Sequence, residues 1–176
     1  MFYFAYGSNM LIARLGERVP SVRPVGRAWL TGHQLHFHLS GSDESGKCNV
    51  LHTGNADDVV HGALYELDAE RLDRLHAAEG PPYAFIELEV GTPTGSVLAA
   101  TYRGRPEYLD DALVPFDWYR DFVTFGAREH GLPAEYVARL EAVPTWRDPD
   151  TDRAAHNRRI LRHQATNVIR DGVENS

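Results

Sequence analysis

FYFAYGSNM, residues 2–10, is the stretch that decides how this chain begins its fold. The aromatic run that opens it is typical of a short buried strand. Ser8 or Asn9 can cap a helix over residues 10–15, which Gly16 would end. The stretch therefore predicts a strand, a tight turn and a helix in immediate succession.

The rest of the chain shows two periodicities. Alternating apolar and polar residues predict strands at 34–39, 59–67, 86–90 and 97–103, the last two forming a hairpin. Helical spacing and end signals predict helices at 69–79, 116–130 and 133–142, and another near 152–163. The regular strand-helix repeat of a doubly wound sheet is absent. We therefore expect an α+β fold.

We expect a single domain with a mostly antiparallel sheet or small barrel flanked by helices. Residues 1–145 should form it, and residues 146–176 should be an extension that is partly helical and packs on or near the same domain. A length of 176 residues suits one domain, and 43% hydrophobic with 24% charged residues is typical of globular proteins.

Charge and composition exclude several classes of function. A net charge of -7 opposes binding to nucleic-acid phosphates. The amino terminus lacks the basic region of an export signal, and no segment approaches the roughly 18 apolar residues of a membrane span. The single cysteine, Cys48, allows no intramolecular disulfide and favours a reducing compartment. We expect a cytoplasmic protein that binds neither nucleic acid nor membrane.

Glu79 is the first candidate for chemistry. It follows Leu72 and Leu75 at helical spacing, so its carboxylate would face the core. A carboxylate in such a place can accept a proton and later donate it. Helix ends are uncertain by one or two residues, however, and a terminal Glu turned to solvent fits the same pattern. Periodicity leaves both interpretations open.

The turn Tyr6-Gly7-Ser8-Asn9 is the second candidate. A turn between a strand and a helix can point several backbone amides at an anion, and glycine lets a ligand approach closely. A capped turn without any ligand fits equally well. Ser8 lacks the flanking glycines of a nucleophile elbow, so we do not expect it to be a nucleophile.

Three other features are better explained without chemistry. His33, His36 and His38 lack a further ligand at matching spacing, so we expect no metal site. Nothing near Cys48 indicates a reactive thiol, and we expect a packed residue. The Arg-rich segment 153–163 could touch an anionic partner, but a solvated helix face explains it as well.

Four segments carry a family resemblance through their shared order and spacing. They are FYFAYGSNM at 2–10, VHGALYEL at 60–67, LHAAEGPPYAFIELEV at 75–90 and FGAREHGLPAEYVARL at 125–140. Together they resemble the γ-glutamylcyclotransferase family, which includes the related γ-glutamylamine cyclotransferases. The resemblance implies the fold of that family.

The resemblance also implies roles for individual residues. Glu79, in the Glu-Gly pair ahead of a strand, corresponds to the catalytic acid/base. The backbone amides of the turn would hold the substrate's α-carboxylate, which implies substrate binding by Tyr6, Gly7, Ser8 and Asn9. Pocket tyrosines are implied at Tyr83, Tyr102 and Tyr119, whereas Tyr136 fits ordinary helix packing.

The reaction implied is a cyclisation of a small-molecule γ-glutamyl amide. The α-amine attacks the γ-carbonyl and releases 5-oxoproline and a free amine or amino acid, without a cofactor or metal. The motifs specify neither the leaving group nor the oligomeric state. The alternative is a non-catalytic protein that binds a glutamate-like or acyl-amino-acid ligand in the same pocket. The presence of a carboxyl group at position 79 argues against this alternative.

Overall fold

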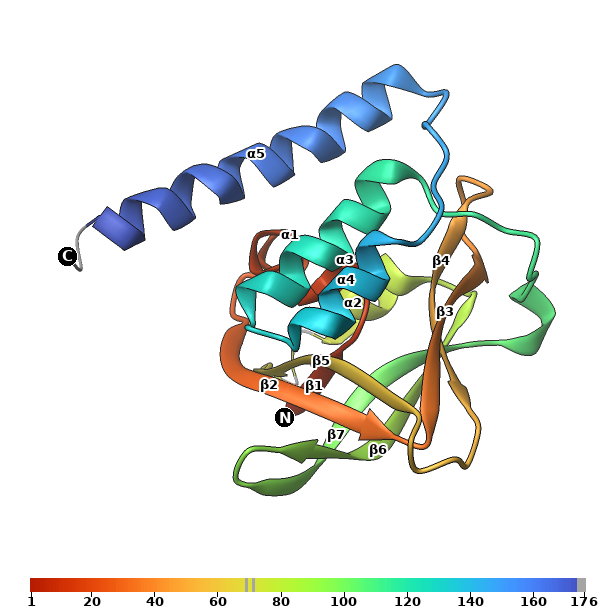
Figure 1. The fold of residues 1–176 in the computed structure, drawn as a ribbon, viewed down its shortest axis with the longest axis vertical. Helices are drawn as coiled ribbons and strands as arrows, with labels where there is room; N and C mark the ends of the chain where they lie inside the picture. Colours follow the sequence, from red (N-terminus) through yellow and green to blue (C-terminus); the bar gives the residue numbers. More distant parts are fainter. Residues whose placement is uncertain (69, 71, 174–176) are drawn as a thin grey trace.

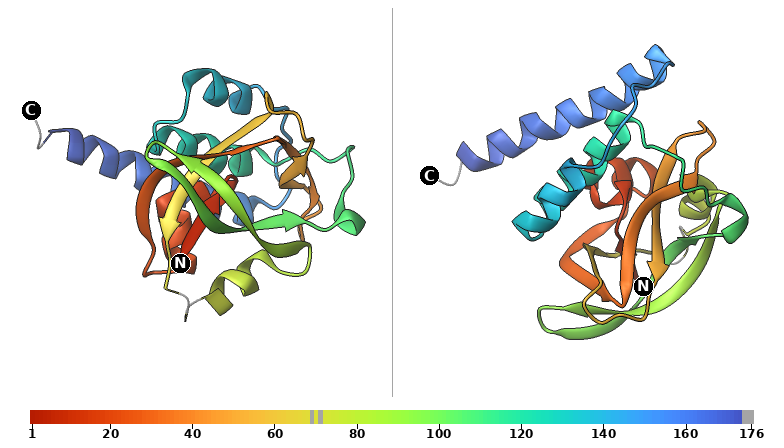
Figure 2. Two further views of the ribbon diagram at one scale, coloured as in Figure 1. Left: turned by 90° about the horizontal axis from the view of Figure 1, so that it is seen from below. Right: turned by 45° about the vertical axis from the view of Figure 1, so that its right-hand side comes forward.

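The computed structural model describes residues 1–68, 70 and 72–173, and its centre is a closed barrel with strand order β1-β5-β2-β6-β7. The strands are β1 Phe2–Ala5, β2 Arg23–Thr31, β5 Val59–Glu66, β6 Tyr83–Thr92 and β7 Gly95–Gly104. Neighbours are antiparallel except β1 and β7, which are parallel. Figure 2 shows the long β6-β7 hairpin, in green, along one side. The mostly antiparallel barrel is confirmed.

The remaining elements surround the barrel (Figure 1). β3 His33–Ser40 and β4 Gly46–His52 pair as a separate two-stranded sheet. The helices are η1 Ser8–Met10, α1 Ile12–Arg18, α2 Leu72–Glu79, η3 Pro106–Tyr108, α3 Asp117–Glu129, α4 Ala134–Glu141 and α5 Thr151–Val173. α4 packs beside α3, and α5 contacts α3 and α1. Within the described part, no helix is long and apolar enough to cross a membrane.

The predicted strands, the hairpin and the helices at 116–130 and 133–142 are present with small shifts of their ends. The patterns do not predict β2 and β4. β2 contains Pro24 and Gly26, and its register with β5 is irregular there, so it lacks a clear alternation. The predicted start of a helix at Ala69 lies outside the described residues. α5 is longer than the helix predicted near 152–163.

The segment after β1 differs from its prediction. Residues 8–10 form a 3₁₀ turn, and the α-helix begins only at Ile12 and passes through Gly16. Neither Ser8 nor Asn9 caps a helix through its side chain. The Ser8 hydroxyl accepts from Arg14 Nε at 3.2 Å, and the Asn9 side chain bonds residues distant in sequence. The capping prediction is wrong because Gly7 stands at the cap of the 3₁₀ turn and Leu11 at the cap of the α-helix, so neither Ser8 nor Asn9 occupies a cap position.

This turn is seated between the barrel and α3. Met10 and Leu11 are fully buried. The Tyr65 hydroxyl, from β5, donates to the Met10 carbonyl at 2.5 Å. On the other side, a Cβ at Gly126 of α3 would lie 2.6 Å from both Leu11 N and Met10 Cβ. The absence of a side chain at residue 126 therefore lets α3 lie against the turn.

Two helical glycines provide a matched test of this seating. Gly126→Ala should lower the free energy of unfolding by about 1–3 kcal/mol, because the new methyl group overlaps the turn backbone. Gly16→Ala should raise it by up to about 1 kcal/mol, since nothing lies within 4 Å of the new Cβ and alanine favours helix. Urea unfolding of both variants measures the difference. Equal effects of the two substitutions would contradict the close seating.

Candidate active site

All eight predicted site residues line one small cavity of about 30 Å³ at the junction of the amino-terminal turn, the barrel and α3. Its lining also includes two residues that the sequence did not single out for the site, Tyr3 and Cys48. The full set is Tyr3, Tyr6, Gly7, Ser8, Asn9, Cys48, Glu79, Tyr83, Tyr102 and Tyr119. The fold therefore brings together residues spread over more than a hundred positions of the chain.

Glu79 points into the molecule at the end of α2. Leu75 of this helix is fully buried, Leu72 packs against the core, and Gly80, with φ of 68°, ends the helix in the left-handed region that favours glycine. The Glu79 side chain is only 11% exposed. Of the two orientations open in the sequence, the structure has the inward one.

One oxygen of Glu79 is held by two donors. Asn9 Nδ2 donates to Glu79 Oε1 at 2.7 Å, and Arg18 Nη1 donates to the same oxygen at 3.0 Å. Arg18 Nη1 also lies 2.8 Å from Asn9 Oδ1, so the three side chains close a triangle. Charge-assisted hydrogen bonds of this kind orient a carboxylate strongly. The carboxylate is thus fixed against the turn.

The tyrosines around the cavity are neutral hydrogen-bonding groups. Burial raises the pKa of Tyr3, Tyr6, Tyr83, Tyr102 and Tyr119, so all five phenols keep their proton at neutral pH. Three of these hydroxyls have partners that engage them: Tyr6 donates to the Tyr102 carbonyl, Tyr83 to the Cys48 carbonyl at 2.7 Å, and Tyr102 pairs with His76 Nδ1 at 2.7 Å.

The other two hydroxyls each accept a hydrogen bond. Tyr119 Oη accepts from the Cys48 amide at 3.0 Å, and Tyr3 Oη accepts from Asn9 Nδ2 at 2.9 Å. Both oxygens are buried beside the cavity. The Tyr119 hydroxyl also hydrogen-bonds the Cys48 side chain, but sulfur is only a weak acceptor. Tyr119 and Tyr3 can therefore donate to a group placed in the cavity.

The turn leaves backbone donors beside the same space. Its helical bonds run from the Met10 amide to the Gly7 carbonyl at 2.9 Å and from the Leu11 amide to the Ser8 carbonyl at 3.3 Å. The first amides of a helical turn have no hydrogen-bond partner within the turn. The backbone amides of Ser8 and Asn9 are therefore the ones that can donate to a ligand. A Cβ on Gly7 would lie 3.0 Å from Cys48 Cβ and 3.5 Å from Tyr119 Oη. A side chain there would crowd the cavity.

Two residues near Glu79 were missed for different reasons. Tyr3 lies in the aromatic strand. Its neighbours Phe4, Ala5 and Tyr6 are buried as well, so no alternation of polar and apolar residues marks Tyr3 as facing the cavity. Arg18 gives no local signal, since only the tertiary structure places it beside Glu79. Cys48 packs as expected, and burial raises the pKa of its thiol to about 12, which opposes thiolate chemistry.

Two of the three β3 histidines, His33 and His38, bond other groups. His38 Nδ1 lies 2.7 Å from Asp111 Oδ1, and its Nε2 lies 3.0 Å from Asn49 Nδ2. His33 Nδ1 lies 2.9 Å from the Thr31 carbonyl. Among the residues that the structure describes, no group of three or more His, Cys, Asp or Glu side chains is arranged to hold a metal ion.

Comparison with known proteins shows the family to which the chain belongs. The sequence profile of the AIG2-like family matches residues 59–140. The chain is 31% identical over 150 residues to human gamma-glutamylcyclotransferase, covering 80% of this chain and 77% of the human protein, and it is similar at 31% to the mouse protein over the same shares. A solved structure of a gamma-glutamyl cyclotransferase superposes with a TM-score of 0.76 at 28% identity, over 83% of this chain and 89% of the other. The chain therefore belongs to the γ-glutamylcyclotransferase family.

Proposed function

We propose that this protein cleaves a γ-glutamyl amide by ring closure and releases 5-oxoproline and a free amine or amino acid. The observation that carries the proposal is the Glu79 carboxylate, which lies in the cavity and is bonded to Asn9 of the amino-terminal turn. This arrangement puts a proton carrier beside backbone amides that suit a substrate carboxylate. The names of the relatives indicate the same class of reaction.

In the proposed reaction the substrate supplies its own nucleophile. The amides of the turn formed by residues 6–9 hold the α-carboxylate. Glu79 takes a proton from the α-ammonium, and the freed amine attacks the γ-carbonyl carbon to form the ring C–N bond. The protonated Glu79 then donates its proton to the departing nitrogen as the original amide bond breaks. The ring nitrogen, which still carries two hydrogens after the attack, gives up its second proton through Glu79 to the released amine, which leaves as an ammonium ion. Glu79 ends as a carboxylate, so the proton balance closes.

The way the cavity holds the substrate would contribute to the rate of ring closure. The cavity is small and open to solvent, so a glutamyl group would fill it and extend out of its mouth. Enclosure by buried tyrosines would hold the glutamyl chain folded back on itself, which removes an entropic barrier to ring closure. Tyr83 and Tyr102 contribute walls, and Tyr3 and Tyr119 can donate to the carbonyl oxygen, Tyr119 by giving up its weak bond to the Cys48 sulfur.

Glu79→Gln tests the proton carrier. The amide keeps the size of the side chain but cannot accept the proton, so kcat should fall by about 10³ or more. The assay incubates the protein with a panel of γ-glutamyl dipeptides and γ-glutamyl amines and measures 5-oxoproline. Glu66→Gln, on the exposed side of the barrel, is the matched control. Full activity of Glu79→Gln would refute the role of Glu79, and glutamate binding without turnover by the unmodified protein would favour a binding protein.

Tyr119→Phe tests the stabilisation of the carbonyl oxygen. Its hydroxyl hydrogen is engaged only by the weakly accepting Cys48 sulfur and can turn to the carbonyl oxygen, so its loss should lower kcat by about 10²-fold. Tyr83→Phe should lower kcat less, since that hydroxyl already donates to the Cys48 carbonyl. Thermal unfolding of both variants separates a catalytic effect from loss of stability. A larger kcat loss for Tyr83→Phe would show that the donor is assigned to the wrong tyrosine.

Arg18→Met tests how the carboxylate is positioned. Removal of the guanidinium frees Glu79 Oε1 from one of its two donors, so kcat should fall about tenfold while KM changes little. Arg18→Lys should restore part of the activity. Arg23→Met provides the control, because Arg23 makes an exposed ion pair with Glu66 away from the cavity. An unchanged kcat in Arg18→Met would remove Arg18 from the proposed mechanism.

A further inference from the structure

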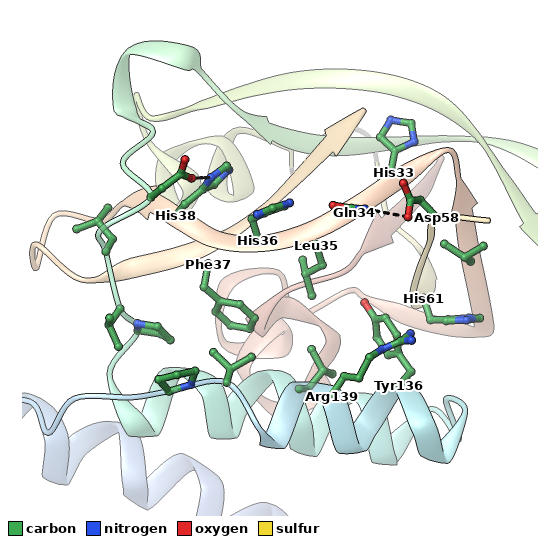
Figure 3. A pocket seen from close by; sticks show the side chains of 18 of the residues that line it. His33, Gln34, Leu35, His36, Phe37, His38, Asp58, His61, Tyr136 and Arg139 are labelled. Atoms are coloured by element: carbon green, nitrogen blue, oxygen red, sulfur yellow. Dashed lines mark hydrogen bonds and ion pairs between the residues drawn. The ribbon is translucent and has the colours of Figure 1, made fainter. Parts of the chain in front are cut away.

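A second cavity of about 930 Å³ lies between β3 and α4 (Figure 3). The loop 111–115 and the start of β5 complete its wall. It shares no lining residue with the tyrosine-lined cavity around Glu79. Its volume is in the range of cavities that enclose small organic molecules, whereas the cavity around Glu79 is far smaller.

One part of this cavity is apolar. Leu35 and Phe37 project from β3 toward α4, as Figure 3 shows. Leu140, Val143 and Pro144 face them from α4 and the segment that follows it. Aliphatic and aromatic walls of this kind favour the hydrocarbon body of a ligand.

Two buried polar atoms on the lining residues have no hydrogen-bond partner. They are Tyr136 Oη and His36 Nε2. Tyr136 is 5% exposed, and the nearby backbone of His61 does not reach hydrogen-bond geometry with its hydroxyl. More than nine in ten buried polar groups in proteins are paired, so two unpaired atoms along one cavity point to a missing partner.

The charges around Tyr136 indicate the kind of partner. Burial raises the pKa of Tyr136, so its hydroxyl stays a donor and needs an acceptor. Arg139, one helical turn further, has its guanidinium 5.4 Å from the centre of the Tyr136 ring. Among the described residues Arg139 forms no ion pair. Two donors, one of them charged, therefore lie together at this end of the cavity.

The other titratable groups limit the ligand's charge. Burial lowers the pKa of His33, His36 and His61, so these rings are neutral at neutral pH. Asp58 accepts from Gln34 Nε2 at 2.9 Å, and Asp111 pairs with His38. With Asp57 they make the cavity's edge acidic, which opposes a ligand of more than one negative charge.

We propose that this cavity binds a small monocarboxylate with an apolar body, its carboxylate on Arg139 and Tyr136 and its body between Phe37 and Leu140. An apolar amino acid and a simple branched-chain acid share this chemistry. The site is independent of the proposed cyclisation, since neither Glu79 nor the turn contributes to it. Phe37 of this cavity makes an edge-to-face contact with Tyr119 of the cavity around Glu79, and the ring centres are 6.4 Å apart.

Three probes with the same branched body but different polar groups test the site. They are 4-methylpentanoate, L-leucine and 3-methylbutylamine, titrated into the full-length protein by calorimetry or NMR. We expect 4-methylpentanoate to bind and 3-methylbutylamine to bind at least about tenfold more weakly. Binding of L-leucine as tight as that of the acid would identify an amino acid as the ligand, and weaker binding would identify a simple acid.

Three variants locate the binding. Arg139→Met should weaken 4-methylpentanoate binding about tenfold or more, and Tyr136→Phe, which removes only the hydroxyl, should weaken it severalfold. Glu79→Gln should bind it as the unmodified protein does. Thermal unfolding confirms that each variant is folded. Failure of all three probes to bind, unchanged binding in Arg139→Met and Tyr136→Phe, or loss of binding in Glu79→Gln would overturn the proposal.

Discussion

The seating of the Gly7–Leu11 turn is the constraint on which the rest of the structure depends. Its backbone lies against α3 at Gly126, and its Met10 carbonyl accepts the Tyr65 hydroxyl of the barrel. These contacts join the barrel and the helical layer at one place. Because protein interiors are closely packed, a shift of this turn would move both layers. The turn is therefore a structural junction as well as a lining of the candidate active site.

The same junction explains how one carboxylate is held in a partly buried place. Asn9 reaches Glu79 from the turn, and Arg18 reaches it from the end of the helix that the turn begins. A buried carboxylate without such partners would strongly destabilise the fold. The ion pair and the hydrogen bond thus meet a requirement of folding, and they also orient the group to which we assign proton transfer.

The two cavities differ in the way their polar groups are satisfied. Around Glu79, most hydroxyl and carboxylate groups already bond one another, and the space is small. Between β3 and α4, the space is large and two buried polar atoms are unpaired. The relatives are named for a reaction, and our proposal places a reaction of that class in the first cavity. The proposal for the second cavity is based on the contacts and unpaired atoms of this chain alone.

The sequence by itself determined the class of fold and most of its elements, because alternation and helical spacing reflect which side of each element is buried. The hairpin of β6 and β7 and the helices α3 and α4 are examples. It also indicated the residues of the site through local motifs such as the turn at Tyr6-Gly7-Ser8-Asn9. Only the tertiary structure decided that Asn9 bonds Glu79 instead of capping a helix, that Glu79 faces inward, and that Arg18 lies beside it. These outcomes depend on contacts between residues far apart in the chain, which no local pattern encodes.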